Sequence, residues 1–127
     1  MKTYLVDTNV FLRFFLKDHS THFAKAKKYF SQAKAGKIKL ILVPQIVFEI
    51  NYVLKKVYSQ KNIKIANLLI DTVSSPYIQT QDQKVLIDSL NTYKKINIDL
   101  VDIYLYQLSK HQKAQVLSFH KYFNKLL

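Results

Sequence analysis

The chain has 127 residues and carries 20 Lys or Arg against 8 Asp or Glu, which gives a formal net charge of +12. Its length suits one domain over residues 1–127, with a core drawn from the 49% of residues that are hydrophobic. The absence of Cys excludes a disulfide framework, a zinc finger and a cysteine nucleophile. One Gly and two Pro argue against an all-β fold built on tight turns.

Apolar patterning, caps and breakers predict strands that alternate with helices. Short strands are predicted at residues 4–6, 38–43, 77–80 and 114–118. Helices are predicted at residues 10–16, 20–35, 44–58, 62–73, 82–95 and 99–112, with a terminal helical turn at 120–127. Such alternation implies a parallel sheet covered on both faces. The expected fold class is α/β, a three-layer α/β/α sandwich with a short parallel sheet of about four strands surrounded by helices.

No stretch of the sequence has the features of a signal peptide or the length of about 18–20 apolar residues that a membrane helix needs. We therefore expect a cytoplasmic protein with no membrane association.

The excess of positive charge indicates a polyanionic partner. A small domain this basic attracts nucleic acid or an acidic protein. The alternative is a solvated lysine surface without function, and it agrees with the fact that every basic residue except Arg13 is Lys. The candidate RNA contacts are the basic residues Arg13, Lys25, Lys28, Lys55 and Lys56.

Asp7 closes the first predicted strand. It is therefore expected at the carboxyl edge of the sheet, where open α/β sheets bind their ligands. Asp is also a common helix N-cap, and this is the alternative role for Asp7.

Glu49 is the only Glu in the chain and is predicted to share a helix face with Ile46, Ile50 and Val53. A carboxylate on an apolar face is costly unless it is paired or bound to a metal. A buried ion pair with Lys is the alternative explanation.

Asp99 and Asp102 lie one turn apart on the same side of the predicted helix 99–112. Both acids would interact favourably with the positive N-terminus of that helix. This alternative explains Asp99 well and Asp102 less well, because Asp102 is flanked by the apolar residues Val101 and Leu105.

Three carboxylates gathered at the strand ends would repel one another unless a divalent cation lay between them. Mg²⁺ and Mn²⁺ prefer hard oxygen ligands of this kind. These ions polarise phosphoryl oxygens and activate water. Asp7, Glu49 and Asp102 are thus the candidate ligands of an acidic metal site in a basic protein, and lysines that hold a phosphate backbone would complement it.

Four segments of the chain resemble PIN-domain proteins, and VapC-type toxins of toxin–antitoxin systems in particular. They are residues 5–10 (LVDTNV) with the following Leu12-Arg13, Phe48-Glu49 within an apolar helix, residues 98–102 (IDLVD), and residues 116–123 (VLSFHKYF). The resemblance runs in order along nearly the whole chain.

This resemblance implies a PIN-like fold and a divalent-metal-dependent endoribonuclease. Asp7, Glu49 and Asp102 would be catalytic and hold Mg²⁺ or Mn²⁺, with Asp99 as an accessory acid. Thr8, Asn9 and Ser118 would orient the ligands. The expected substrates are structured RNAs, tRNA or rRNA, whose cleavage stops translation. The expected partners are a VapB-like antitoxin and a second copy of the chain.

The last turn departs from the family pattern, which often places acids where this chain has His120 and Tyr122. A fourth ligand and a second metal ion are therefore open questions. Two alternative functions remain from the sequence: a catalytically inactive PIN-like module that binds nucleic acid, and a basic module that binds an acidic protein.

Overall fold

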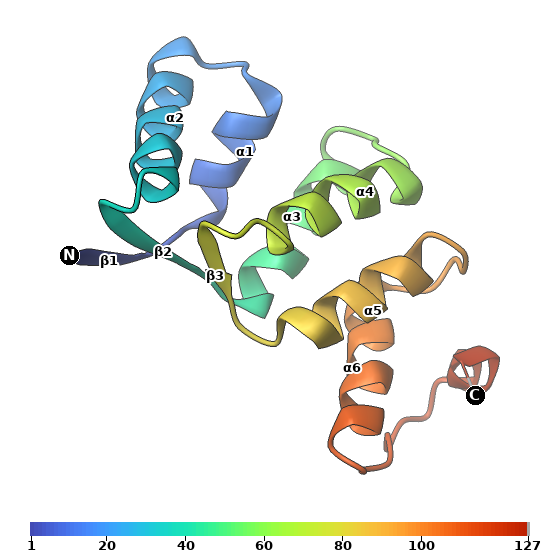
Figure 1. Cartoon of the computed structure of the whole chain (residues 1–127). Helices are drawn as coiled ribbons and strands as arrows, with labels where there is room; N and C mark the ends of the chain where they lie inside the picture. Colours follow the sequence, from blue (N-terminus) through green and yellow to red (C-terminus); the bar gives the residue numbers. More distant parts are fainter. Residues whose placement is uncertain (127) are drawn as a thin grey trace.

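The computed structural model of the chain describes residues 1–126, without the side chains of 122, 124 and 125. Within this range three strands form one parallel sheet in the order β1-β2-β3, and six α-helices and a short 3₁₀-helix pack around it (Figure 1). The strands are β1 (Lys2–Leu5), β2 (Ile38–Leu42) and β3 (Ile78–Thr80). The helices are α1 (Thr8–Leu16), α2 (Ser20–Lys34), α3 (Pro44–Lys56), α4 (Asn62–Val73), α5 (Gln83–Tyr93), α6 (Leu100–His111) and η1 (Lys121–Leu126). The predicted α/β class is confirmed.

Local signals in the sequence set several of these boundaries. Gly36 has φ 76°, a left-handed conformation that ends the α2 region at little steric cost. Pro44 occupies the first turn of α3, where its missing N–H is not needed. The side chain of Asp99 accepts a hydrogen bond from the Val101 N–H at 2.9 Å and thereby caps α6.

One face of the sheet is buried more deeply than the other. The parallel register pairs Tyr4 with Leu40 and Leu40 with Ile78, and these residues face the helices. Leu40 and Ile78 are buried, whereas Leu5, on the opposite face, is 74% exposed. Alternate residues of a strand point to opposite faces, so this contrast identifies the side on which the core forms.

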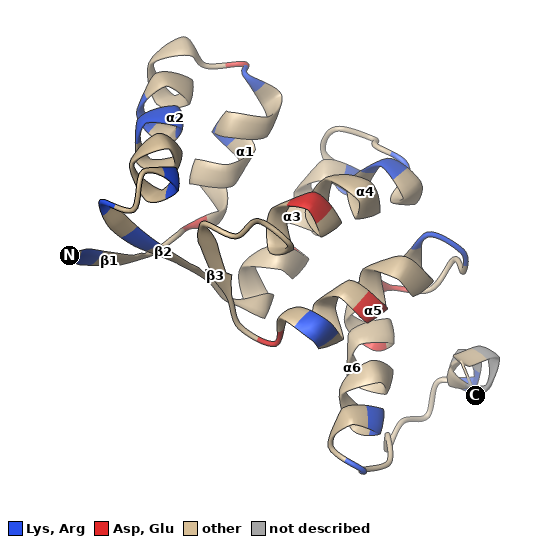
Figure 2. Cartoon of the chain, in the orientation of Figure 1, with Lys and Arg blue, Asp and Glu red and all other residues tan. Residues whose placement is uncertain are grey.

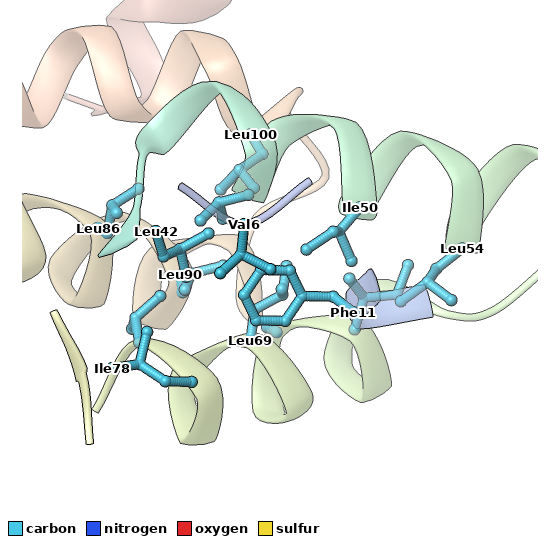
Figure 3. Packing of buried hydrophobic residues seen from close by; sticks show 14 of the residues in the cluster. Val6, Phe11, Leu42, Ile50, Leu54, Leu69, Ile78, Leu86, Leu90 and Leu100 are labelled. Atoms are coloured by element: carbon cyan, nitrogen blue, oxygen red, sulfur yellow. The ribbon is translucent and has the colours of Figure 1, made fainter. Parts of the chain in front are cut away.

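The core lies where α1, α3, α4 and α5 meet the buried face of the sheet (Figure 3). Phe11, Leu42, Ile50, Leu69 and Leu90 are completely buried there. Burial of a side chain of this size stabilises the fold by about 1.5–3 kcal/mol. The core therefore fixes the positions of the helices that carry the candidate acids.

The predicted fourth strand at residues 114–118 is wrong. This segment is irregular, and Leu117 is 94% exposed. A strand needs a neighbour with free N–H and C=O groups, but α6 leads the chain away from the sheet. The C-terminal end lies on the side of the molecule opposite β1 (Figure 1). η1 packs against α6 instead, in place of the predicted helical turn at 120–127, and Leu127 lies outside the described residues.

Among residues 1–126, no helix combines the length and the apolar character needed to cross a membrane.

Two polar contacts join α5 to α6. The Tyr104 hydroxyl donates a hydrogen bond to Oδ2 of Asp82 at 2.8 Å, and Nε2 of His111 lies 3.2 Å from Oδ2 of Asp88. Burial raises the pKa of Tyr104 to about 12, and the hydrogen bond to Asp82 and the negative charge of that residue add to the effect. Protonated Tyr104 is thus part of the contact between the two helices.

The Tyr104→Phe variant tests this contact. An unperturbed Tyr has a pKa of 10.0, so protonated Tyr104 stabilises the fold fully below pH 10, and this contribution is lost as the pH rises through 12. The variant should lose about 0.5–1 kcal/mol of unfolding free energy at pH 7. Its stability should also fall less steeply than that of the wild type above pH 10.

Urea denaturation at pH 7, 9 and 11 measures both effects. Tyr106→Phe is the matched control, because Tyr106 lies on the same helix and its ring contacts Lys110. Equal losses at alkaline pH for the wild type and both variants would contradict a role for the Tyr104 proton.

Candidate functional site

Asp7 lies where β1 gives way to α1, at the carboxyl edge of the sheet. The ladder continues one residue beyond β1, because the Val6 N–H donates to the Ile41 carbonyl at 3.1 Å. Asp7 has the extended backbone of an N-cap residue (φ −78°, ψ 158°), yet its side chain accepts no capping hydrogen bond. Its carboxylate is exposed and free for another role. The sheet-edge position is confirmed, and the side-chain cap is not formed.

The neighbours of Asp7 differ in their surroundings. Thr8 is 3% exposed, and its Oγ1 has no hydrogen-bond partner within the described residues. Asn9 is exposed and lines a cavity between α1 and α2. Within the described residues, neither side chain forms a hydrogen bond to Asp7 through which it could orient that carboxylate.

Glu49 lies on the exposed side of α3, away from the buried face of that helix. The buried side of α3 consists of Val47, Ile50, Leu54 and the polar Asn51. Glu49 follows Val47 by two positions, which places it roughly 200° around the helix. The predicted apolar stripe is therefore wrong for Glu49, which is exposed, and the alternative of a buried pair with Lys is wrong as well, since no ion pair of Glu49 is found among residues 1–126.

Asp99 and Asp102 begin α6 and have different roles. Asp99 is the N-cap and has an oxygen bonded to the Val101 N–H. Asp102 lies in the first turn and is partly buried. The favourable position of an acid at a helix N-terminus therefore accounts for Asp99, as the sequence indicated.

The helices that carry Glu49 and Asp102 touch next to these acids. Phe48 precedes Glu49, and its ring packs edge-on against Tyr104, two residues after Asp102, with centroids 5.0 Å apart. α3 also packs against α1, which begins just after Asp7. Glu49 thus lies on α3, and Asp7 and Asp102 lie at the starts of two helices, α1 and α6, that contact α3. Within residues 1–126, however, no three Asp, Glu, His or Cys side chains lie close enough together to hold a metal ion.

Sequence reasoning missed two residues beneath this region, Asn51 and Tyr93. Burial raises the pKa of the Tyr93 hydroxyl, the nearby Asn51 side chain opposes the shift, and the charge of Asp99 adds to it. Asn51 is 8% exposed and its Oδ1 has no partner in the described structure. Asn51 on α3 and Tyr93 at the end of α5 are therefore neighbours, and the charge of Asp99 acts on Tyr93. The only sequence signal for them was a polar residue within the apolar stretch after Glu49.

The candidate RNA contacts are spread over several elements. The Arg13 guanidinium lies 2.9 Å from the Asp18 carboxylate, which also accepts a hydrogen bond from Tyr58. The Lys55 ammonium lies 5.8 Å from the centre of the Tyr93 ring. Three further lysines among the candidates are exposed: Lys25 and Lys28 on α2 and Lys56 at the end of α3. Figure 2 shows basic residues (blue) on α2 and on the segment that enters β2.

The last turn does not reach the sheet edge. Ser118 is exposed, and its Oγ accepts a hydrogen bond from the His120 N–H at 3.0 Å, so it supports its own turn. The side chain of Tyr122 lies outside the described ones. The expected role of Ser118 beside the ligands is not seen, because the fourth strand that would carry it there does not form.

Comparisons with known proteins agree with this architecture. The family model described as PIN domain matches residues 4–126, nearly the whole chain. No curated protein and no solved structure matches it. The match spans the strand end with Asp7, the helix with Glu49 and the helix with Asp102. The chain belongs to the PIN domain family.

Proposed function

We propose that this chain is a divalent-metal-dependent endoribonuclease whose ligands are Asp7, Glu49 and Asp102. PIN domains are generally nucleases, and the family match covers all three acids. A charge of +12 supports a nucleic-acid substrate, because lysines on the surface attract the phosphate backbone.

This proposal rests mainly on which acidic side chains have no ion-pair or hydrogen-bond partner in the described structure. The chain has 20 Lys or Arg for 8 Asp or Glu, so an acid can find a cation readily. Asp18 and Asp88 do so, with Arg13 and His111. Asp7 and Glu49 form no ion pair or side-chain hydrogen bond within the described residues, although both are accessible to solvent. Asp71 is likewise exposed and unpaired there, but it lies outside the segments that resemble PIN-domain proteins. Carboxylates left open in so basic a protein are available to a ligand.

The donor set fits Mg²⁺ or Mn²⁺. All the candidate ligands are carboxylates, the hard oxygen donors that these ions prefer. One buried oxygen without a partner among the described residues, Thr8 Oγ1, is next to Asp7 in the sequence. When bound, such an ion polarises a phosphoryl oxygen and lowers the pKa of water.

The chain's own residues supply position and charge. The parallel sheet holds Asp7 at its carboxyl edge, and the contact between Phe48 and Tyr104 holds the helices of Glu49 and Asp102 against each other. Asp99 caps α6 and so fixes the turn that contains Asp102. Because the three acids stand apart in this structure, a shared cation would draw their side chains together.

The biological role that we propose is that of the toxin in a toxin–antitoxin pair. Its substrates would be tRNA or rRNA, and its partners a VapB-like antitoxin and a second copy of the chain in the cytoplasm. The resemblance of residues 5–10 and 98–102 to VapC-type toxins supports this role. Exposed apolar side chains at Leu5, Leu117 and Phe119 offer contact area for a protein partner.

A module that binds nucleic acid without cleaving it is the second candidate. Two observations favour it. No three acids lie at metal-binding distance within residues 1–126, and the last turn carries His120 where the family often has an acid. This candidate predicts RNA binding that is independent of the three acids.

Cleavage of total cellular RNA tests the choice. The wild type should produce discrete fragments with Mg²⁺ or Mn²⁺ and none with a chelator. Asp7→Asn and Asp102→Asn should each lower the cleavage rate about 100-fold or more, as loss of a group that stabilises transition-state charge does. Asp71→Asn is the matched control, because Asp71 is an exposed acid on α4, and this variant should cleave at the wild-type rate.

If the wild type shifts RNA on a gel yet cuts nothing with either metal, the nuclease proposal fails and the binding module stands. Equal activity of all three variants and the wild type would instead remove Asp7 and Asp102 from the site.

Thermal unfolding with Mn²⁺ gives a second test that needs no substrate. A ligand that binds only the folded state stabilises it by about 2.7 kcal/mol at 100 times its Kd. We expect the melting temperature of the wild type to rise with Mn²⁺ and to return with a chelator. Glu49→Gln should abolish most of the rise while melting near the wild-type temperature in chelator, since Glu49 is exposed and unpaired among the described residues. An undiminished rise in Glu49→Gln would exclude Glu49 as a ligand.

A further inference from the structure

Two cavities between α1 and α2 adjoin each other, because Val10 and Tyr29 line both. The first has a volume of about 280 Å³ and is lined by Asn9, Val10, Arg13, His22, Lys25, Ala26 and Tyr29. The second has a volume of about 210 Å³, and Asp7, Tyr4 and Leu40 are among its lining residues. Together they form a hollow, called here the α1–α2 hollow, that leads from a cluster of basic side chains to Asp7.

The two ends of the α1–α2 hollow carry opposite charges. Arg13, His22 and Lys25 line one end and Asp7 the other. Arg13 forms an ion pair with Asp18, in which a guanidinium nitrogen lies 2.9 Å from a carboxylate oxygen, whereas Lys25 has no ion-pair partner within the described residues. The His22 ring is stacked on His19 with centroids 4.0 Å apart. The wall of this cavity consists almost entirely of carbon atoms, so Lys25 and His22 can offer N–H donors to an anionic group at its mouth and not within it.

The wall between the two ends is apolar and aromatic. Val10 and Ala26 contribute aliphatic surface, and the Tyr29 ring is held edge-on against Tyr4 with centroids 5.5 Å apart. Tyr29 nevertheless remains 41% exposed. An aromatic ring that is fixed by one neighbour and still accessible can stack on a flat ligand at small entropic cost.

We propose that the α1–α2 hollow binds one unpaired nucleotide of the RNA, with its base against Tyr29 and its phosphate towards Lys25 and His22. Proteins read single-stranded RNA by combining a basic groove with aromatic side chains on which bases stack. A base within a duplex is covered on both faces by its neighbours and cannot reach Tyr29. The inference rests on the proposed ribonuclease function, because Asp7 opens into the same hollow and would lie beside the bound strand.

Binding to a 2-aminopurine oligonucleotide tests the stacking. The probe is an unstructured eight-nucleotide RNA with one 2-aminopurine, in chelator, so that no cleavage occurs. The wild type should quench the probe fluorescence and bind it more tightly than a blunt RNA duplex of the same sequence. Tyr29→Ala should lose the quenching and weaken binding about 5- to 150-fold, the range of one base–aromatic stack. Tyr29→Phe keeps the ring and should behave as the wild type.

The salt dependence of binding tests the phosphate contact. Lys25→Ala should lower the slope of log affinity against log salt concentration by about 0.7, the value for one contact to a single strand. Lys64→Ala is the matched control, because Lys64 is exposed on α4, is not among the candidate RNA contacts and lies outside the lining of the hollow. Circular dichroism checks that each variant is folded, and the comparison of Lys25→Ala with Lys64→Ala remains decisive if Tyr29→Ala unfolds.

Equal effects of Lys25→Ala and Lys64→Ala would overturn the inference, as would binding of duplex and single strand with equal affinity and no quenching. We would then assign the hollow to the binding of an apolar side chain from a partner protein. A different result would show that the proposed nuclease function is wrong while the hollow still binds a nucleotide. In that case the wild type would quench the probe and yet cut no RNA with either metal.

Discussion

Parallel pairing of β1 with β2 is the constraint on which the candidate site depends. The carboxyl ends of parallel strands meet at one edge of a sheet, so α1 and α3 begin side by side. Asp7 therefore stands close to the helix that carries Glu49, although 42 positions separate them in the sequence. An antiparallel pair would place the two helix starts at opposite edges. Burial of Leu40 and Leu42 against the helices maintains this pairing.

The distribution of partners among the acids identifies those with a structural role. Asp82 and Asp88 join α5 to α6, Asp99 caps α6, and Asp18 pairs with Arg13. Asp7, Glu49 and Asp71 contribute no such contact within residues 1–126, and of these three only Asp7 and Glu49 lie in segments that resemble PIN-domain proteins. Accessible acids that stabilise nothing visible in the fold and lie in such segments are most simply explained by function. The α1–α2 hollow relates the assignment of Asp7 to the proposed RNA substrate, because it runs from Asp7 to the basic residues Arg13 and Lys25.

Features set by local chemistry could be predicted from the sequence. Gly36, Pro44 and Asp99 act through the conformation and hydrogen bonds of their own turn, and the helix ends predicted beside them agree with the structure to within one residue. The position of Asp7 at a strand end follows equally from a short apolar run. The family resemblance added the order of the acids along the chain.

Features set by distant partners could not be predicted. Residues 114–118 have the composition of a strand, but only the path of α6 decides whether they reach the sheet. The face on which Glu49 lies depends on the side of α3 that meets the core, and Ile46 and Val53 suggested the wrong one. The hydrogen bond of Tyr104 to Asp82 joins residues 22 positions apart and leaves no local pattern.

The most direct measurement is a crystal structure grown with Mn²⁺ and recorded with the anomalous signal of the metal. We expect an anomalous peak with carboxylate oxygens of Asp7, Glu49 and Asp102 in its coordination shell, and a small closure of α6 and α3 towards Asp7. A peak elsewhere, for example at the stacked pair His19 and His22, or no peak at saturating Mn²⁺, would show that these three acids do not form a metal site.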